Sequence, residues 1–366
     1  MSEKIEVGVL FGGESAEHEI SIRSANNVIE AMDREKYRIF LIGITRDGRW
    51  YAGKTAELIL ESGEVSGYTV SEDDLLGFVP GRAGSNIVYI SDTKKKINPD
   101  VIFPVLHGPM GEDGTVQGLL RLSGIPFVGA GVLGSAASMD KDVMKRLFRD
   151  NGIPVGGFRV MHSYEKEGIS YDEIVSELGS PLFIKPANMG SSVGVNKVGN
   201  REDFYGAVTE AFRFDNKILV EEFIEGRELE CAVLGNEYPI ASATGEICAR
   251  DNFYSYRAKY IDENGAVLNI PAELPDETND RIKDLALKSF RTVCCEGMAR
   301  VDCFLKKDGT VIVNEINTIP GFTSISMYPM LFEVSGIPYN ELIDRLICLA
   351  MERGEKEKRL ETDYKN

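Results

Sequence analysis

Cysteine, histidine and long apolar runs are all scarce in this sequence. Its 366 residues include six cysteines and three histidines. Six cysteines with no C-x-x-C pair indicate neither the disulfide framework of a small secreted protein nor a zinc site. No apolar run approaches the ~20 residues that a membrane-spanning helix needs, and the first residues lack the basic and apolar segments of a secretory signal peptide. We therefore expect a cytoplasmic protein with free thiols and no membrane partner.

Basic residues are outnumbered as well. The chain has 41 Lys and Arg against 58 Asp and Glu, which gives a net charge of −17. A charge of this sign repels a phosphate backbone, so the composition argues against nucleic acid as a partner. Nucleotide phosphates can still bind where lysines gather locally.

The pattern of apolar residues predicts an α/β (α+β) chain of three domains followed by a tail. Residues 1–126 are expected to form an α/β unit with parallel strands, residues 127–222 a second unit and residues 223–352 a third. Residues 353–366 are almost all charged or polar and are expected to be a solvated tail. Expected strands include residues 5–11, 38–44, 101–106, 158–161, 182–186 and 217–224. Expected helices include residues 16–32, 115–122, 202–212 and 277–294, and one that Asp140 caps and Gly152 ends.

A hairpin near the C-terminus is the most informative local feature. Two strands, at residues 298–305 and 311–317, flank the dipeptide Asp308-Gly309, which is the strongest short hairpin signal. We expect these two residues to form a two-residue turn. Counting back along both strands from that turn then fixes which residues lie opposite each other.

This count places Asp302 opposite Glu315 and Arg300 opposite Asn317, all on one face. Directly opposed side chains have Cβ atoms roughly 5 Å apart, so two carboxylates there repel unless a cation lies between them. Oxygen ligands from Asp302, Glu315 and Asn317 would leave positions open for phosphate and water, as nucleotide-bound magnesium requires. The same residues also suit a solvent-facing surface on which Arg300 pairs with Asp302. The hairpin alone does not decide between the two.

Two lysines and a glycine-rich loop indicate phosphate binding. Lys185 ends an expected strand and precedes residues 187–194, a run of small residues whose backbone N–H groups can surround phosphates. Lys141 begins the helix that Asp140 caps. The loop is not a P-loop, because no Gly-Lys-Ser/Thr follows it.

Two other interpretations of the glycine-rich segments fail. Residues 190–194 match Gly-x-Ser-x-Gly with Ser192 as a hydrolase nucleophile, but all three histidines precede Ser192 and no helix is expected after it. Gly12-Gly13 lacks the spacing of a dinucleotide-binding turn. A noncatalytic nucleotide-binding module stays open as a different class of function.

Seven segments in chain order together carry more information than any one of them. They are GGESAEHEIS (12–21), HGPMGEDG (107–114), MDK (139–141), KP (185–186) with GSSVG (190–194), YRAKY (256–260), RVD (300–302) and EINTIPGFTS (315–324). In this order they resemble the D-alanine:D-alanine ligases of the ATP-grasp superfamily. The resemblance implies a three-domain ATP-grasp architecture in which the second and third domains sandwich ATP.

The resemblance also implies the ligand contacts of the nucleotide and the metal. Phosphates would be held by Lys141, Lys185 and Lys259. Adenine and ribose would be held by Glu221, Phe223, Ile224 and Glu228. Two Mg²⁺ ions, for which Mn²⁺ can substitute, would be held by Asp302, Glu315 and Asn317, with Glu315 bridging them.

The implied reaction joins two D-alanine molecules for peptidoglycan precursor synthesis. ATP phosphorylates the first carboxylate to an acyl phosphate, which the second amine attacks, so catalysis is chiefly charge neutralisation and positioning. The implied substrate contacts are Glu17, Ser191 and Tyr260 for the first amino group, His107 near the first substrate, Arg300 and the N–H of Gly321 for the oxyanion, and Ser324 and Ser326 for the second carboxylate.

Substrate choice is left open by the sequence. Tyr260 resembles the dipeptide-forming members of the family, but a D-alanine:D-serine ligase is an alternative, because a methyl and a hydroxymethyl group differ by only about 1–3 kcal/mol in a pocket. Another ATP-grasp carboxylate–amine ligase is a further alternative. A homodimer is expected from the resemblance alone.

Overall fold

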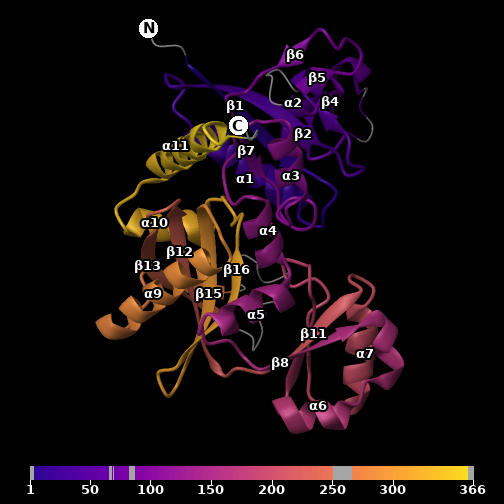
Figure 1. The fold of residues 1–366 in the computed structure, drawn as a ribbon, viewed down its shortest axis with the longest axis vertical. Helices are drawn as coiled ribbons and strands as arrows, with labels where there is room; N and C mark the ends of the chain where they lie inside the picture. Colours follow the sequence, from indigo (N-terminus) through magenta and orange to yellow (C-terminus); the bar gives the residue numbers. More distant parts are fainter. Residues whose placement is uncertain (1–3, 66–67, 69, 82–86, 250–265, 362–366) are drawn as a thin grey trace, which may run out of the picture.

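The computed structural model describes residues 4–361 except 66–67, 69, 82–86 and 250–265. Within these residues the strands form four sheets. Figure 1 shows the N-terminal sheet at one end of the molecule and the elements around β8 and β11 at the other, with β12, β13, β15 and β16 between them. The predicted mixed α/β class is confirmed.

The N-terminal sheet has the strand order β3-β2-β1-β7. Strands β2 and β7 both pair with β1 in parallel, as the buried apolar runs predict, whereas the short β3 is antiparallel. Its elements are β1 (Ile5–Gly12), α1 (His18–Ala31), β2 (Tyr37–Ile44), β3 (Trp50–Tyr51), α2 (Gly53–Ser62), β7 (Val101–Val105) and α3 (Thr115–Leu122). A smaller sheet consists of β4 (Leu76–Phe78), β5 (Ile87–Tyr89) and β6 (Lys96–Ile97), preceded by the short helix η1 (Glu72–Asp74).

The middle of the chain forms an antiparallel sheet of order β10-β9-β11-β8. Its elements are α4 (Val132–Met139), α5 (Lys141–Asp150), β8 (Phe158–His162), η2 (Ser163–Gly168), α6 (Tyr171–Leu178), β9 (Leu182–Pro186), β10 (Asn196–Val198), α7 (Arg201–Ala211) and β11 (Lys217–Glu222). Asp140 caps α5 as predicted, because its carboxylate accepts hydrogen bonds from the N–H groups of Asp142 and Val143. This cap fixes where the lysine-bearing helix begins.

The third sheet is antiparallel, with the order β14-β13-β12-β15-β16. Its elements are β12 (Gly226–Gly235), β13 (Ile240–Ala249), β14 (Ala266–Asn269), α9 (Asp276–Thr292), β15 (Gly297–Lys306), β16 (Val311–Asn317), α10 (Met327–Val334) and α11 (Tyr339–Lys358). Helix α11 returns to lie against the N-terminal sheet (Figure 1), so Leu342 and Leu346 share one buried cluster with Val9 and Phe103. The beginning and the end of the chain therefore fold around a common core.

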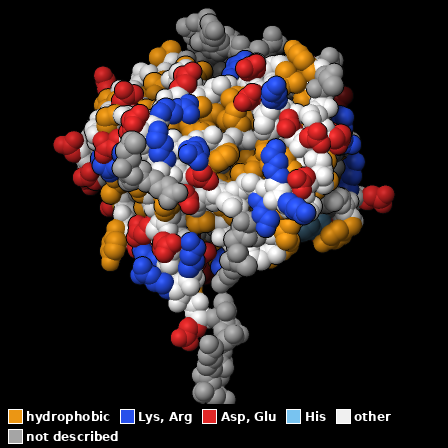
Figure 2. Space-filling model, turned by 90° about the horizontal axis from the view of Figure 1, so that it is seen from above, with side chains coloured by type: hydrophobic (Ala, Val, Ile, Leu, Met, Phe, Trp, Pro, Cys, Tyr) orange, Lys and Arg blue, Asp and Glu red, His pale blue; other side chains and the backbone are white. Residues whose placement is uncertain are grey.

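The molecular surface carries both charges and apolar groups. On the face seen from above, hydrophobic side chains lie among acidic and basic ones (Figure 2), so basic groups are well represented there despite the net charge of −17. Among the described helices, none is long and apolar enough to cross a bilayer.

The β15–β16 hairpin has the predicted pairs but not the predicted turn. The Lys306 N–H donates a hydrogen bond to the carbonyl oxygen of Thr310 across the turn. This leaves a three-residue loop that ends at Gly309, whose φ is +82°. The expected two-residue turn is therefore wrong; this turn matches the common three-residue type. A bulge at Asn314 shifts the register by one residue. Farther from the turn, Asp302 consequently faces Glu315, as expected.

The charged tail expected from residue 353 is also corrected, since α11 continues to Lys358 and Arg353 is buried. Arg353 donates hydrogen bonds to the carbonyl oxygens of Gly129 at 2.6 Å and Phe127 at 2.7 Å. It also pairs with Glu296 at 3.3 Å and lies over the Phe127 ring. Its charge is thus satisfied inside the protein, and a charged residue in the sequence is here part of the core.

We expect the Arg353→Met variant to lose about 2–4 kcal/mol of unfolding free energy, because two buried carbonyl groups lose their donor. Unfolding in urea, followed by circular dichroism, measures the loss. Lys356→Met is the matched control, since Lys356 lies on the same helix but makes only exposed ion pairs. Equal stability of the two variants would contradict the role of Arg353.

Candidate nucleotide and metal site

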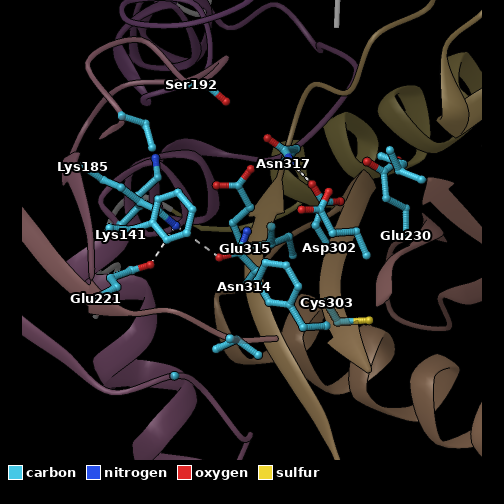
Figure 3. Close-up of a pocket in the computed structure, with 18 of the residues that line it drawn as sticks. Lys141, Lys185, Ser192, Glu221, Glu230, Asp302, Cys303, Asn314, Glu315 and Asn317 are labelled. Carbon is cyan, nitrogen blue, oxygen red and sulfur yellow. Dashed lines mark hydrogen bonds and ion pairs between the residues drawn. The ribbon is translucent and has the colours of Figure 1, made fainter. Parts of the chain in front are cut away.

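A cavity of about 470 Å³ lies between the sheet of β9 and β11 and the sheet of β12, β15 and β16. Figure 3 shows basic side chains entering from one wall and acidic and amide side chains from the other. The predicted residues that line it are Lys141, Lys185, Ser191, Glu221, Phe223, Ile224, Glu228, Asp302, Glu315 and Asn317. Residues nearly 180 positions apart in the sequence are thus gathered around one cavity.

The basic wall comes from α5 and β9. Lys141 and Lys145 lie one turn apart on α5 and both line the cavity, since residues i and i+4 share a helix face. Lys141 donates a hydrogen bond to the carbonyl oxygen of Met189 at 2.6 Å, which ties the helix to the glycine-rich loop. Lys185, on β9, also contacts the amide oxygen of Asn314 at 3.5 Å, across the cavity.

Glu221, on β11, is buried between two lysines. Its Oε2 lies 2.7 Å from Lys185 Nζ and its Oε1 lies 3.2 Å from Lys145 Nζ. Burial alone would raise the pKa of Glu221, but Lys145 and Lys185 outweigh it and hold the pKa at about 2. Burial lowers the pKa of Lys145, an effect that Glu221 partly offsets. The carboxylate is therefore ionised and can only accept hydrogen bonds.

The acidic wall is the predicted face of the β15–β16 hairpin. Asp302 lies opposite Glu315, and Arg300 lies opposite Asn317. The bulge at Asn314 turns both Asn314 and Glu315 toward the cavity, because a bulge places two consecutive residues on one side of a strand. Asn317 Nδ2 donates to Asp302 Oδ2 at 3.1 Å. The wall thus combines two carboxylates with two amides.

Arg300 takes part in the ion pair that the alternative interpretation of the hairpin expected. Its guanidinium binds both oxygens of Asp302 at 2.7 Å and also lies 3.0 Å from Glu230 Oε2. Glu230 lies directly across from Asp302 on the other neighbouring strand, β12. Three carboxylates, Glu230, Asp302 and Glu315, therefore occupy adjacent strands in one row, and Arg300 neutralises part of this charge.

The donor set of this wall suits a hard divalent cation that also binds a ligand. No group of three or more His, Cys, Asp or Glu side chains within the described ranges can hold a metal by itself. Asp302 and Glu315, with the amide oxygen of Asn317, offer part of an oxygen coordination sphere. Phosphate oxygens and water would have to complete it, which is how magnesium binds together with a nucleotide. The residues therefore fit a metal ion that enters with the nucleotide.

The glycine-rich loop lies against the N-terminal unit. Ser191 donates a hydrogen bond from Oγ to the buried Glu17, and a Cβ on Gly190 would lie 3.3 Å from Glu17 and 3.4 Å from Glu112. Glu112 accepts a hydrogen bond from the N–H of Gly108. Burial, and then the charge of Glu17, raise the pKa of Glu112 to about 8.

The remaining predicted substrate residues are not among those that line the cavity. His107 is buried, contacts the carbonyl oxygen of Ile319 at 3.1 Å through Nδ1, and has a pKa that burial lowers. Ser326 Oγ accepts a hydrogen bond from the Thr323 N–H, and a Cβ on Gly321 would lie only 2.7 Å from it. Ser324 is exposed.

Two predicted residues, Lys259 and Tyr260, lie outside the described residues, as does Arg257 of the same segment. Conversely, four residues around the site were given no role from the sequence: Glu112, Lys145, Glu230 and Asn314. The spacing of Lys141 and Lys145 was a usable signal, because both belong to the helix that Asp140 caps. The bulge that turns Asn314 toward the cavity has no comparable signal in the sequence.

Comparisons with known proteins agree with this geometry. The family model "D-ala D-ala ligase N-terminus" matches residues 6–130, and "D-ala D-ala ligase C-terminus" matches residues 147–348. The chain belongs to the D-alanine–D-alanine ligase family. It is an enzyme of this family, with the ATP-grasp fold, and the family's dependence on ATP implies a divalent metal.

Individual relatives cover nearly all of the chain. The D-alanine–D-alanine ligase of Oceanobacillus iheyensis is 51% identical over 360 residues, 98% of each chain. The solved D-alanine-D-alanine ligase of Coxiella burnetii has a TM-score of 0.85 at 39% identity and covers 98% of this chain and 97% of its own. The VanG D-Ala:D-Ser ligase of Enterococcus faecalis has a TM-score of 0.83 at 36% identity and covers 95% and 100%.

Proposed function

We propose that this protein uses ATP and two Mg²⁺ ions, which Mn²⁺ can replace, to join two D-alanine molecules into D-alanyl-D-alanine for peptidoglycan precursor synthesis. The observation that carries the proposal is the cavity itself. Lys141 from α5 and Lys185 from β9 face two carboxylates and two amides from the β15–β16 hairpin across a space of about 470 Å³. A triphosphate with its metal ions needs charges of both signs in this arrangement.

The nucleotide would lie with its phosphates on Lys141, Lys185 and Lys259. Glu221 would accept a hydrogen bond from the adenine amino group, since an ionised carboxylate has no proton to donate. Phe223 and Ile224, which line the same cavity, would contact the base, and Glu228 the ribose. The γ-phosphate would then point toward the hairpin and the glycine-rich loop.

Asp302, Glu315 and Asn317 would hold the metal ions. The ions would offset the negative charge of the phosphates when the γ-phosphoryl group moves to the first D-alanine carboxylate. The residues of the hairpin act by fixed position, because both strands belong to one antiparallel sheet. A rigid support of this kind is what charge stabilisation in the transition state requires.

The two amino acids would bind between the hairpin and the N-terminal unit. Glu17, Ser191 and Tyr260 would hold the first amino group, and His107 would lie near the first substrate. After the acyl phosphate forms, the second amine attacks its carbonyl carbon, and Arg300 and the N–H of Gly321 would donate hydrogen bonds to the oxyanion. The C–O bond to phosphate then breaks, inorganic phosphate leaves and the nitrogen loses a proton, which gives the amide. Ser324 and Ser326 would bind the second carboxylate.

D-Serine as the second substrate is the alternative that one specific observation favours, namely the likeness to the VanG D-Ala:D-Ser ligase over 95% of the chain. We expect D-alanine to support phosphate release from ATP as sole substrate, with D-alanyl-D-alanine identified by mass. Adding D-serine or D-lactate together with limiting D-alanine shows which second substrate the enzyme prefers. Preferential formation of D-alanyl-D-serine would overturn the dipeptide assignment, and ATP binding without turnover would favour a binding module.

The proposal extends to location and assembly. We place the enzyme in the cytoplasm, where ATP is present, without a nucleic-acid or membrane partner. A homodimer is proposed from the family resemblance, and light scattering of the purified protein tests it.

A further inference from the structure

Lys145 is a buried cation that the proposed roles leave without a task. Lys145 is 2% exposed, and its Nζ lies 3.2 Å from Glu221 Oε1. A charged lysine buried to this degree is unfavourable unless it is paired. Its place on the cavity wall, one turn after Lys141 on α5, puts this pair beside the proposed nucleotide.

Glu221 is held by two lysines, one on each oxygen. Lys185 binds Oε2 at 2.7 Å and Lys145 binds Oε1. If Lys185 is to bind a phosphate, as proposed above, it must weaken its contact with Glu221. A buried carboxylate that loses its only cation is strongly destabilised, so a single lysine at this place would remain bound to Glu221. A second cation that stays on Glu221 would keep the carboxylate paired, so that Lys185 could leave it.

We propose that Lys145 is a positioning residue that keeps Glu221 neutralised and correctly oriented, so that Lys185 is released to the nucleotide phosphates. Lys145 itself does not touch the nucleotide. The inference rests on the proposed function, in which Lys185 binds phosphate and Glu221 binds adenine. It adds an order of events: the Lys145–Glu221 pair persists, while the Lys185–Glu221 pair gives way when ATP enters.

We expect the Lys145→Met variant to have a KM for ATP at least about tenfold higher, with kcat at saturating ATP within about threefold of the unmodified enzyme. Methionine keeps the length of the side chain and removes the charge, so Glu221 retains Lys185. Steady-state phosphate release at varied ATP and saturating D-alanine gives both constants. Lys54→Met, at an exposed lysine of α2, is the control and leaves both unchanged.

A double variant separates positioning from direct contact. When Glu221→Gln removes the carboxylate, its ion pair no longer holds Lys185, so adding Lys145→Met should change the KM for ATP by less than about threefold. This comparison also decides the matter if the single Lys145→Met variant does not fold, because the double variant has no unbalanced charge at this pair. A large further loss in the double variant would mean that Lys145 binds the nucleotide itself, which overturns the proposal.

The same measurements distinguish this inference from the proposed function beneath it. If Glu221→Gln leaves both the KM for ATP and the preference for ATP over inosine triphosphate unchanged, the assignment of Glu221 to adenine fails. If Glu221→Gln raises the KM for ATP or reduces the preference for ATP over inosine triphosphate, while Lys145→Met leaves the KM for ATP unchanged, only the role of Lys145 fails.

Discussion

We expect the Glu315→Gln enzyme to release phosphate from ATP in the presence of D-alanine about 10³-fold more slowly than the unmodified enzyme. Glu315 lies opposite Asp302 on the cavity face of the hairpin, and glutamine keeps its size but not its charge. The loss should appear mainly in kcat, because the charge acts most strongly when the phosphoryl group is in transfer. The rate of phosphate release at saturating ATP and D-alanine, recorded at varied Mg²⁺ concentrations, measures this loss in kcat.

Two further observations belong to this experiment. The Mg²⁺ concentration for half-maximal rate should rise in the Glu315→Gln enzyme, since one anionic ligand is missing, and a chelator should abolish the rate of both proteins. Asp308→Asn is the matched control, because Asp308 belongs to the same hairpin but lies exposed in its turn. A Glu315→Gln enzyme that keeps its rate within about tenfold and its metal requirement unchanged would disprove the proposed metal site.

The hairpin also shows how far the sequence alone could go. Counting from Asp308-Gly309 gave the right partners for Asp302 and Arg300, although the turn is one residue longer than expected. The bulge at Asn314 restores the count. Turn length and bulges depend on packing of the whole sheet and leave weak local signals, so the correct pairs resulted from two deviations that cancel.

The electrostatic partners were harder to predict than the site residues. The resemblance assigns Glu221 to the adenine amino group and predicts no protein partner for it, whereas the fold places Lys145 and Lys185 on its two oxygens. Such contacts join α5, β9 and β11, which are separated in sequence, so residue spacing cannot predict them. Arg353 illustrates the same limit: its neighbours in sequence are polar, so only the return of α11 to the N-terminal core explains its burial.

The second large effect concerns Arg300, whose guanidinium binds Asp302 through two nitrogens and also reaches Glu230. We expect Arg300→Met to lower kcat at least about 10²-fold, because an oxyanion donor is lost. We also expect it to lose about 3 kcal/mol of unfolding free energy, because Glu230 and Asp302 lose the cation between them. Phosphate release and urea unfolding measure the two effects.

These two effects of Arg300 can be separated, because Glu230 lies on the far side of Asp302 from Glu315 (Figure 3). Glu230→Gln removes one of the two carboxylates that Arg300 contacts, and Glu230 lies on β12 rather than on the hairpin. In the Arg300→Met/Glu230→Gln variant, unfolding free energy should largely return while kcat stays low. Return of both would mean that Arg300 only balances charge, whereas return of stability alone means that its guanidinium acts on the reacting groups.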